Sequence, residues 1–195
     1  MAHIANKIDA KDKKLSEILS GQRYKIDVFQ REYRWQRVQI DALISDLSLS
    51  FFFFFQDGDS IENSNSYDCY YMGPIVVCQD GKGDLSIVDG QQRLTSFTLS
   101  MIYLNHLQKE LNIDEDSSFD LSTYLYVKKG GRKTLVLNIE NRNTIIEQLI
   151  DNPTNVFVDE SQIESLESNQ NLVLRYEDIS TLFPSEIKTQ EILPI

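Results

Sequence analysis

The sequence contains little cysteine and little histidine, and these shortages argue against two classes of fold. It has two cysteines, Cys69 and Cys78, and two histidines among 195 residues. There is no CxxC pair and no Cys/His spacing typical of a zinc site. The two cysteines flank a predicted strand and, if that strand is regular, lie too far apart to bridge. We therefore expect free, buried thiols and no metal- or disulfide-stabilised fold.

Long apolar segments and one common nucleotide motif are also missing. No apolar run approaches the ~18 residues that cross a membrane, and residues 1–9 lack the apolar centre of a signal peptide. We therefore expect a cytoplasmic protein without membrane contact. The string G-x-x-x-x-G-K-[ST] does not occur, which excludes a P-loop site. The 41% hydrophobic content nevertheless permits a substantial core.

Positive charge is scarce, with 19 Lys and Arg against 30 Asp and Glu and a net charge of −11. The deficit is largest in residues 112–195, which hold 7 basic and 15 acidic residues. Bulk charge therefore opposes non-specific nucleic-acid binding. Contact with DNA would need a local patch, for which Arg23–Arg37 is the candidate because five basic residues and four aromatic residues are interleaved there.

Hydrophobic periodicity predicts an α+β fold with antiparallel hairpins and packed helices rather than a doubly wound parallel sheet. The predicted helices cover residues 13–20, 38–55, 91–111, 141–150 and 169–183. The predicted strands cover residues 24–28, 70–78, 85–89, 124–127 and 134–139. Residues 56–68 are predicted to form a loop. The aromatic run Phe51–Phe55 is expected to divide between the core and an interface.

The most informative segment is Ile87–Thr95, which predicts a strand end, a glycine turn and the first turn of a long helix. Polar side chains therefore lie where free N–H groups and the positive end of the helix dipole favour phosphate. One alternative is structural, because Asp89 and Gln92 have the spacing of a capping box. Arg93 opposes the dipole there, which indicates a bound phosphate or a nearby carboxylate.

Three segments together resemble a known family. They are Val28–Trp35, Tyr71–Val77 and Ile87–Thr95, with the strings QREYRW and DGQQR. Over roughly residues 13–150 their order and spacing are similar to the DGQQR family, the N-terminal domain of GmrSD-type (Type IV) restriction endonucleases. The resemblance implies a ParB/sulfiredoxin-like core and a role in bacterial defence against phage or modified DNA.

The resemblance also implies a nucleotide site at the DGQQR segment. Such a domain would bind, and would be expected to hydrolyse, a nucleoside triphosphate with Mg²⁺, and so gate a nuclease. The implied catalytic residues are Asp89, Gln91, Gln92 and Arg93, with Asp89 also the metal ligand. The implied nucleotide-binding residues are Gly90, Thr95, Gln30, Arg31, Tyr33, Trp35 and Gly73.

The nuclease itself is expected elsewhere. Members of the family often carry an HNH nuclease module, which needs several histidines, whereas this chain has His3 and His106 alone. We expect residues 1–155 to form the nucleotide-binding domain and residues 156–195 to be an acidic helical extension that begins a further region. The competing hypothesis is a non-catalytic module that binds DNA or a partner through Arg31, Arg34 and Phe51–Phe55.

Overall fold

The structure is a computed structural model, and it describes residues 8–26, 32–79, 83–114, 119–161, 163 and 165–194. Its helices are α1 Leu15–Leu19, α2 Arg37–Phe54, α3 Ile61–Ser64, α4 Gln91–Glu110, α5 Ser122–Leu125, α6 Asn143–Asp151 and α7 Leu166–Leu182. Its strands are β1 Tyr24–Lys25, β2 Val76–Gln79, β3 Leu85–Asp89, β4 Tyr126–Lys129, β5 Arg132–Leu135 and β6 Leu137–Asn138. Within these residues, no helix is both long and apolar enough to cross a membrane.

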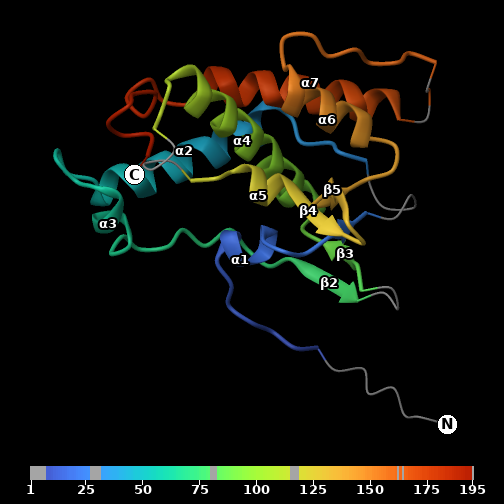
Figure 1. Cartoon of the computed structure of the whole chain (residues 1–195), viewed down its shortest axis with the longest axis horizontal. Coiled ribbons are helices and arrows are strands. Elements are labelled where there is room, and N and C mark those ends of the chain that lie inside the picture. The colour runs from blue at the N-terminus through green and yellow to red at the C-terminus, as the bar shows by residue number, and fades with distance from the viewer. Residues whose placement is uncertain are drawn as a thin grey trace.

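A four-stranded mixed sheet positions the polar segment that follows β3. Its order is β2-β3-β1-β6, with β2 antiparallel to β3 and with β1 parallel to both β3 and β6. Parallel pairing brings the carboxyl ends of β1, β3 and β6 to the same edge of the sheet. The segment that follows β3 at this edge starts α4. A separate hairpin, β4–β5, lies beside the sheet (Figure 1).

Four helices enclose the core on one side of the sheet. Helix α7 packs against α2, α4 and α6, and Figure 1 shows these helices stacked above the strands. Helix α4 is central, since seven consecutive residues from Leu94 to Ser100 are buried. Its side chains Leu94, Leu99 and Ile102 share one hydrophobic cluster with Leu172 of α7. The acidic end of the chain thus contributes a helix to the same core as the preceding residues.

The α+β prediction is confirmed, whereas the relation to the ParB/sulfiredoxin fold stays a prediction. Helix α4 and strand β3 begin where the sequence predicts. Three details differ: residues 61–64 form α3, residues 70–75 precede rather than form β2, and the predicted second hairpin starts later. In that last region residues 122–125 are helical, and residues 137–138 leave the hairpin to pair in parallel with β1. Local periodicity does not specify such long-range parallel pairing.

Two burial predictions were wrong. Cys69 and Cys78 are free but exposed. Cys78 belongs to the edge strand β2, whose four residues are all exposed, and Cys69 lies in the exposed segment 68–70 that precedes it. None of Phe51–Phe55 belongs to the buried core. The rings of Phe51, Phe54 and Phe55 instead form a small surface cluster with Tyr67. The end of α2 therefore extends beyond the core, and Phe53 is 80% exposed there.

A buried carboxylate at the start of β3 connects the two sheets. Asp84 is 2% exposed and pairs with Lys25 (Nζ–Oδ2 2.5 Å), with Arg23 (3.6 Å) and with Lys129 of β4. Burial alone raises the pKa of Asp84. Hydrogen bonds from Lys129 and Lys25 and the charge of Arg23 outweigh that effect and lower the pKa from 3.8 to about 2. Asp84 is therefore ionised at neutral pH.

We expect Asp84→Asn to lower the free energy of unfolding by about 2 kcal/mol at neutral pH. This is less than the roughly 3–5 kcal/mol for a fully buried pair, since the partner cations are partly exposed. Because the folded pKa is depressed, the contribution is complete above pH 3.8 and disappears as the pH falls toward 2. Urea unfolding at several pH values measures this effect, with Asp41→Asn on the exposed surface of α2 as control.

Candidate functional site

Gly90 forms the turn between β3 and α4. It is the N-cap of α4 and has a left-handed backbone with φ +92°, a conformation that disfavours residues with a Cβ. A Cβ here would also lie 3.2 Å from the Cα of Ile75. The predicted capping box of Asp89 and Gln92 is wrong, because Gly90 occupies the cap position and no side chain caps it. Within the described residues, no side chain therefore caps the first turn of α4.

Gln92 fixes the loop that faces this turn. Its Oε1 accepts hydrogen bonds from the backbone N–H groups of Arg34 (2.8 Å) and Trp35 (3.2 Å), and its Nε2 donates to the carbonyl of Glu32 (2.8 Å). The DGQQR and QREYRW segments, to which the resemblance assigns one nucleotide site, are thus in direct contact. The Gln92 amide uses both its oxygen and its nitrogen in this contact.

We expect Gln92→Ala to lower the free energy of unfolding by about 1–2 kcal/mol, since each net hydrogen bond contributes about 1 kcal/mol and water replaces part of the loss. Gln91→Ala is the matched control. Gln91 is the preceding residue, and its buried Oε1 has no hydrogen-bond partner among the described residues. Equal loss in the two variants, measured by urea unfolding, would contradict the assigned contact.

The Arg93 side chain packs against the backbone of Met72 and Gly73, in the segment that precedes β2. Its Nη1 donates to the carbonyl of Met72 (2.9 Å), and its Nη2 lies 3.9 Å from Oδ2 of Asp89. Gly73 makes this possible, because a Cβ there would lie 2.1 Å from Arg93 Nη1. The resemblance implies that Gly73 binds nucleotide, and in the structure Gly73 passes close to the guanidinium of Arg93. The Arg93 side chain remains 25% exposed.

The other predicted residues of this turn differ in exposure. The Asp89 side chain is 68% exposed, so its carboxylate is accessible to a cation. Gln91 is half-buried, and its buried Oε1 has no hydrogen-bond partner within the part of the chain that the structure describes. Thr95 is 1% exposed, so it packs inside the protein. Within the described residues there is no cluster of three or more His, Cys, Asp or Glu that could hold a metal ion.

Helix α7 holds the facing loop from the other side. Ser168 accepts a hydrogen bond from the Tyr33 N–H (3.1 Å), Asn171 donates to the Tyr33 carbonyl (3.1 Å), and Arg175 donates to the Trp35 carbonyl (3.1 Å). The Tyr33 ring is 1% exposed, and its hydroxyl lies 2.8 Å from Oγ of Ser96. Burial raises the pKa of this hydroxyl, which stays neutral.

These contacts assign different roles to the predicted loop residues. Tyr33 anchors the loop, whereas Trp35 is half-buried and reaches a pocket. Arg34 is exposed. Gln30 and Arg31, both predicted to bind nucleotide, lie outside the described residues. The candidate DNA segment Arg23–Arg37 is divided, since Arg23 lies near Asp84 and Arg37 pairs with Asp178 of α7 (2.5 Å).

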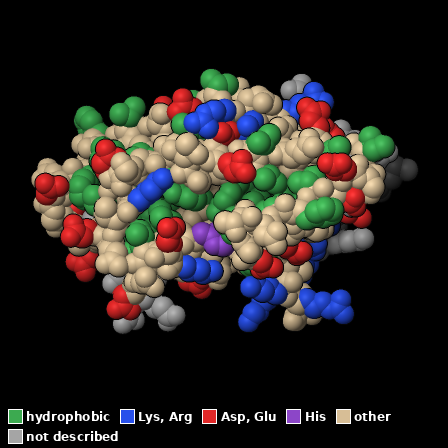
Figure 2. All heavy atoms as spheres, turned by 90° about the horizontal axis from the view of Figure 1, so that it is seen from above, with side chains coloured by type: hydrophobic (Ala, Val, Ile, Leu, Met, Phe, Trp, Pro, Cys, Tyr) green, Lys and Arg blue, Asp and Glu red, His purple; other side chains and the backbone are tan. Residues whose placement is uncertain are grey.

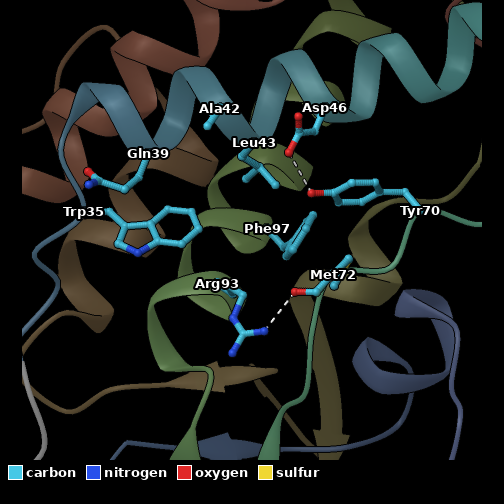
Figure 3. A pocket seen from close by; sticks show the side chains of 9 residues that line it. All are labelled: Trp35, Gln39, Ala42, Leu43, Asp46, Tyr70, Met72, Arg93 and Phe97. Atoms are coloured by element: carbon cyan, nitrogen blue, oxygen red, sulfur yellow. Dashed lines mark hydrogen bonds between the residues drawn. The ribbon is translucent and has the colours of Figure 1, made fainter.

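A pocket of about 220 Å³ opens beside Arg93, between α2, α4 and the chain before β2 (Figure 3). Its apolar walls are Trp35, Ala42, Leu43, Tyr70, Met72 and Phe97. Its polar groups are Gln39, Asp46 and Arg93. Figure 3 shows Arg93 at one end of the pocket and Asp46 at the other, with Trp35 and Tyr70 on opposite sides.

The two ends of the pocket differ in charge. Asp46 accepts a hydrogen bond from the Tyr70 hydroxyl (2.9 Å). Burial, together with this bond and the charge of Asp46, raises the pKa of Tyr70. A carboxylate at one end and a guanidinium at the other can orient a ligand that is anionic on one side and carries hydrogen-bond donors on the other.

Sequence reasoning missed most of the pocket walls. Gln39 and Asp46 lie on the solvent side of the predicted helix 38–55, and Tyr70 and Met72 were placed in a strand. The spacing of Gln39 and Asp46, seven residues apart, puts both on one helical face. This spacing is a weak signal for a pocket, because it does not indicate which other element packs over that face of the helix.

Comparison with protein families shows which family carries these motifs. Residues 15–193 match the family model described as GmrSD restriction endonuclease, N-terminal domain. The chain belongs to this family. The match confirms the resemblance inferred from the QREYRW and DGQQR strings and extends it through α7. No curated protein is similar to the chain at a significant level.

Membership in the GmrSD N-terminal domain family identifies the chain as part of a restriction and defence protein. The match includes both segments that meet through Gln92 and the helix α7 that supports Trp35. The family description names no ligand for this domain.

Proposed function

We propose that this GmrSD N-terminal domain binds a nucleoside triphosphate with Mg²⁺, hydrolyses it, and so regulates a DNA nuclease located elsewhere. The observation that carries this proposal is the pocket itself. It joins Arg93 of the DGQQR segment to Trp35 of the facing loop, two segments that are far apart in the sequence. A cleft between these segments is what a shared ligand requires.

The phosphates belong at the Arg93 end. Arg93 carries five N–H donors, and its side-chain hydrogen bond within the described residues uses one of them, to Met72. The first turn of α4, which no side chain of the described residues caps, adds backbone N–H groups and the positive end of the helix dipole. Asp89 is exposed beside Arg93 and could bind Mg²⁺, which needs one or two carboxylates together with substrate phosphates.

The base belongs in the aromatic part of the pocket. A volume of about 220 Å³ is below the range of about 300–1,000 Å³ typical of whole-ligand pockets, so one ring system enters and the rest stays outside. Trp35 offers a stacking surface. The Asp46 carboxylate repels phosphate and accepts hydrogen bonds from the N–H groups of a base, which orients the nucleotide with its phosphates toward Arg93.

Hydrolysis requires a positioned water. Gln91 is the candidate for this role, because its Oε1 has no partner among the described residues, whereas the Gln92 amide is engaged by the loop. A glutamine amide can orient an attacking water toward a phosphoryl group. Arg93 and Mg²⁺ would then stabilise the charge that develops on the transferred phosphoryl.

The test is thermal unfolding of the purified chain with ATP, GTP, CTP or UTP and Mg²⁺, followed by phosphate release with and without DNA. A nucleotide at about 100 times its dissociation constant should stabilise the chain by about 2.7 kcal/mol. If no nucleotide shifts the transition and no phosphate is released, the proposal is wrong. That result favours the competing hypothesis of a non-catalytic module that uses Arg31, Arg34 and Phe51–Phe55.

A further inference from the structure

Basic side chains cluster at one place in this acidic chain, around the β4–β5 hairpin. This place lies at the opposite edge of the sheet from the start of α4 and its pocket. The cationic hairpin, defined here as β4–β5 with the adjoining Arg23 and Lys25, contains six basic residues. They are Arg23, Lys25, Lys128, Lys129, Arg132 and Lys133. Acidic side chains are scattered over the molecular face in Figure 2, whereas several Lys and Arg side chains project together at its lower edge.

The ion pairs of Asp84 assemble this group. Asp84 contacts Arg23 and Lys25 at the amino ends of the parallel strands, and it contacts Lys129 of the hairpin. The hairpin and β1 are separated by a hundred residues of chain, so the sequence does not reveal their proximity. The hairpin lies at the amino edge of the sheet, whereas α4 starts at the carboxyl edge.

The register of the hairpin places like charges directly opposite each other. Lys128 pairs with Lys133, and Lys129 pairs with Arg132. Like charges at directly opposite positions destabilise a strand pair. Asp84 offsets the charge of Lys129, and Lys133 lies 3.8 Å from the centre of the Tyr126 ring, but Lys128 and Arg132 are exposed. Residues that work against their local structure indicate a role beyond it.

The shape of the hairpin fits a groove. The turn is Gly130-Gly131, with φ +58° and +77°, and a Cβ at either glycine would meet nothing within 4 Å. The tip is therefore narrow and unobstructed. The major groove of B-form DNA, about 12 Å wide, admits a two-stranded β-ribbon. The major groove of double-stranded RNA is deep and narrow and does not.

Among the described residues, Asp84 is paired with Lys129 near the turn, and two further acidic residues lie at the other end of the hairpin. Glu147 and Asp151 of α6 act electrostatically on Tyr126, the first residue of β4. Positive charge is thus concentrated toward the turn. A DNA strand following the tip would meet Lys128, Arg132 and Lys133 before it met these carboxylates.

We propose that the cationic hairpin is a DNA-binding element that enters the major groove of a B-form duplex and neutralises its phosphates. The choice of DNA rests on the groove geometry and on the restriction family of the chain. It does not depend on nucleotide binding at the α4 pocket. Lys128 and Arg132 lie on different strands of the ribbon and contact phosphates on the two sides of the groove.

The test uses the double variant Lys128→Gln and Arg132→Gln. It removes one member of each like-charge pair and preserves the contacts of Lys129 with Asp84 and of Lys133 with Tyr126. The control is Lys13→Gln with Lys109→Gln, which removes the same charge from exposed positions of the N-terminal segment and of the last turn of α4. Fluorescence anisotropy with a short labelled DNA duplex, without nucleotide or Mg²⁺, measures the affinity.

The wild-type chain and the control should bind the duplex alike at low salt. The hairpin variant should bind about tenfold or more weakly, and the slope of log affinity against log salt should fall by about 1.8, two phosphate contacts at roughly 0.9 each. Its thermal stability should be unchanged or higher, since like-charge pairs are removed.

Three outcomes overturn the proposal. One is no binding of the wild-type chain to the duplex, and another is equal weakening by the hairpin and control variants, which indicates bulk charge. The third is equal affinity for a double-stranded RNA of the same sequence, which contradicts entry into the major groove. Because nucleotide is absent from the assay, failure here leaves the result of the nucleotide-binding test unaffected.

Discussion

Replacement of Arg93 by alanine is expected to abolish the stabilisation that a bound nucleotide gives to the chain. A charge-assisted hydrogen bond contributes about 1.5–3 kcal/mol, so affinity should fall about ten- to hundredfold. Phosphate release should fall by about 10²–10³, the usual cost of removing one charge-stabilising donor. Nucleotide titration by fluorescence and phosphate release measure the two effects. Arg93→Lys keeps the charge without the planar fork and should be intermediate.

Arg34→Ala is the matched control for Arg93. Arg34 belongs to the facing loop, and its contact with Gln92 is made by the backbone N–H, which the substitution preserves. The ligand-free stability of Arg93→Ala should fall slightly, because the Met72 carbonyl loses its donor. If Arg34→Ala reduces nucleotide affinity as much as Arg93→Ala does, the phosphates do not lie at the α4 end of the pocket.

Replacement of Gly73 by alanine is expected to weaken nucleotide binding indirectly, by displacing the Arg93 side chain that contacts it. The new Cβ would lie 2.1 Å from Nη1 and 3.2 Å from Cζ of Arg93, so the guanidinium must move. Because an arginine side chain can shift, the fold should survive with a loss of about 1–2 kcal/mol from the strained backbone at φ +87°. Nucleotide affinity should fall about tenfold or more, approaching Arg93→Ala.

Gly58→Ala separates backbone strain from the displacement of Arg93. Gly58 has φ +93°, close to that of Gly73, but a Cβ there would meet nothing within 4 Å. Both variants should therefore lose similar stability in urea unfolding, while Gly58→Ala binds nucleotide as the wild type does. Unchanged affinity in Gly73→Ala would show that the observed position of Arg93 is not needed for binding.

The motif-bearing elements could be predicted because their signals are local. The start of α4 follows from a glycine after a β-branched strand and from apolar residues at helical spacing, among them Leu94, Phe97 and Leu107. The presence of a facing loop followed from the family resemblance. The partner of each polar side chain could not be predicted. The spacing of Asp89 and Gln92 suggested a capping box, and nothing in the sequence indicates the hydrogen bond of Gln92 with the Trp35 N–H.

Features that depend on tertiary packing could not be predicted. The parallel pairing of β1 with β6 joins residues more than a hundred positions apart, and Lys25 and Lys129 both pair with Asp84. Asp46 becomes a pocket residue because Tyr70 lies across from α2. The prediction that part of the Phe51–Phe55 run lies in the core was wrong because the end of α2 extends beyond the helices that form the core.

The loop that carries Trp35 is bonded to two helices, and this has a mechanical consequence. Gln92 of α4 holds its N–H groups, while Arg175 of α7 holds the Trp35 carbonyl and the Gln36 side chain. A displacement of α7 relative to α4 must break these bonds or carry the indole with it. Any molecule that prefers one placement of the indole is therefore energetically coupled to the docking of α7, by as much as its affinities for the two placements differ.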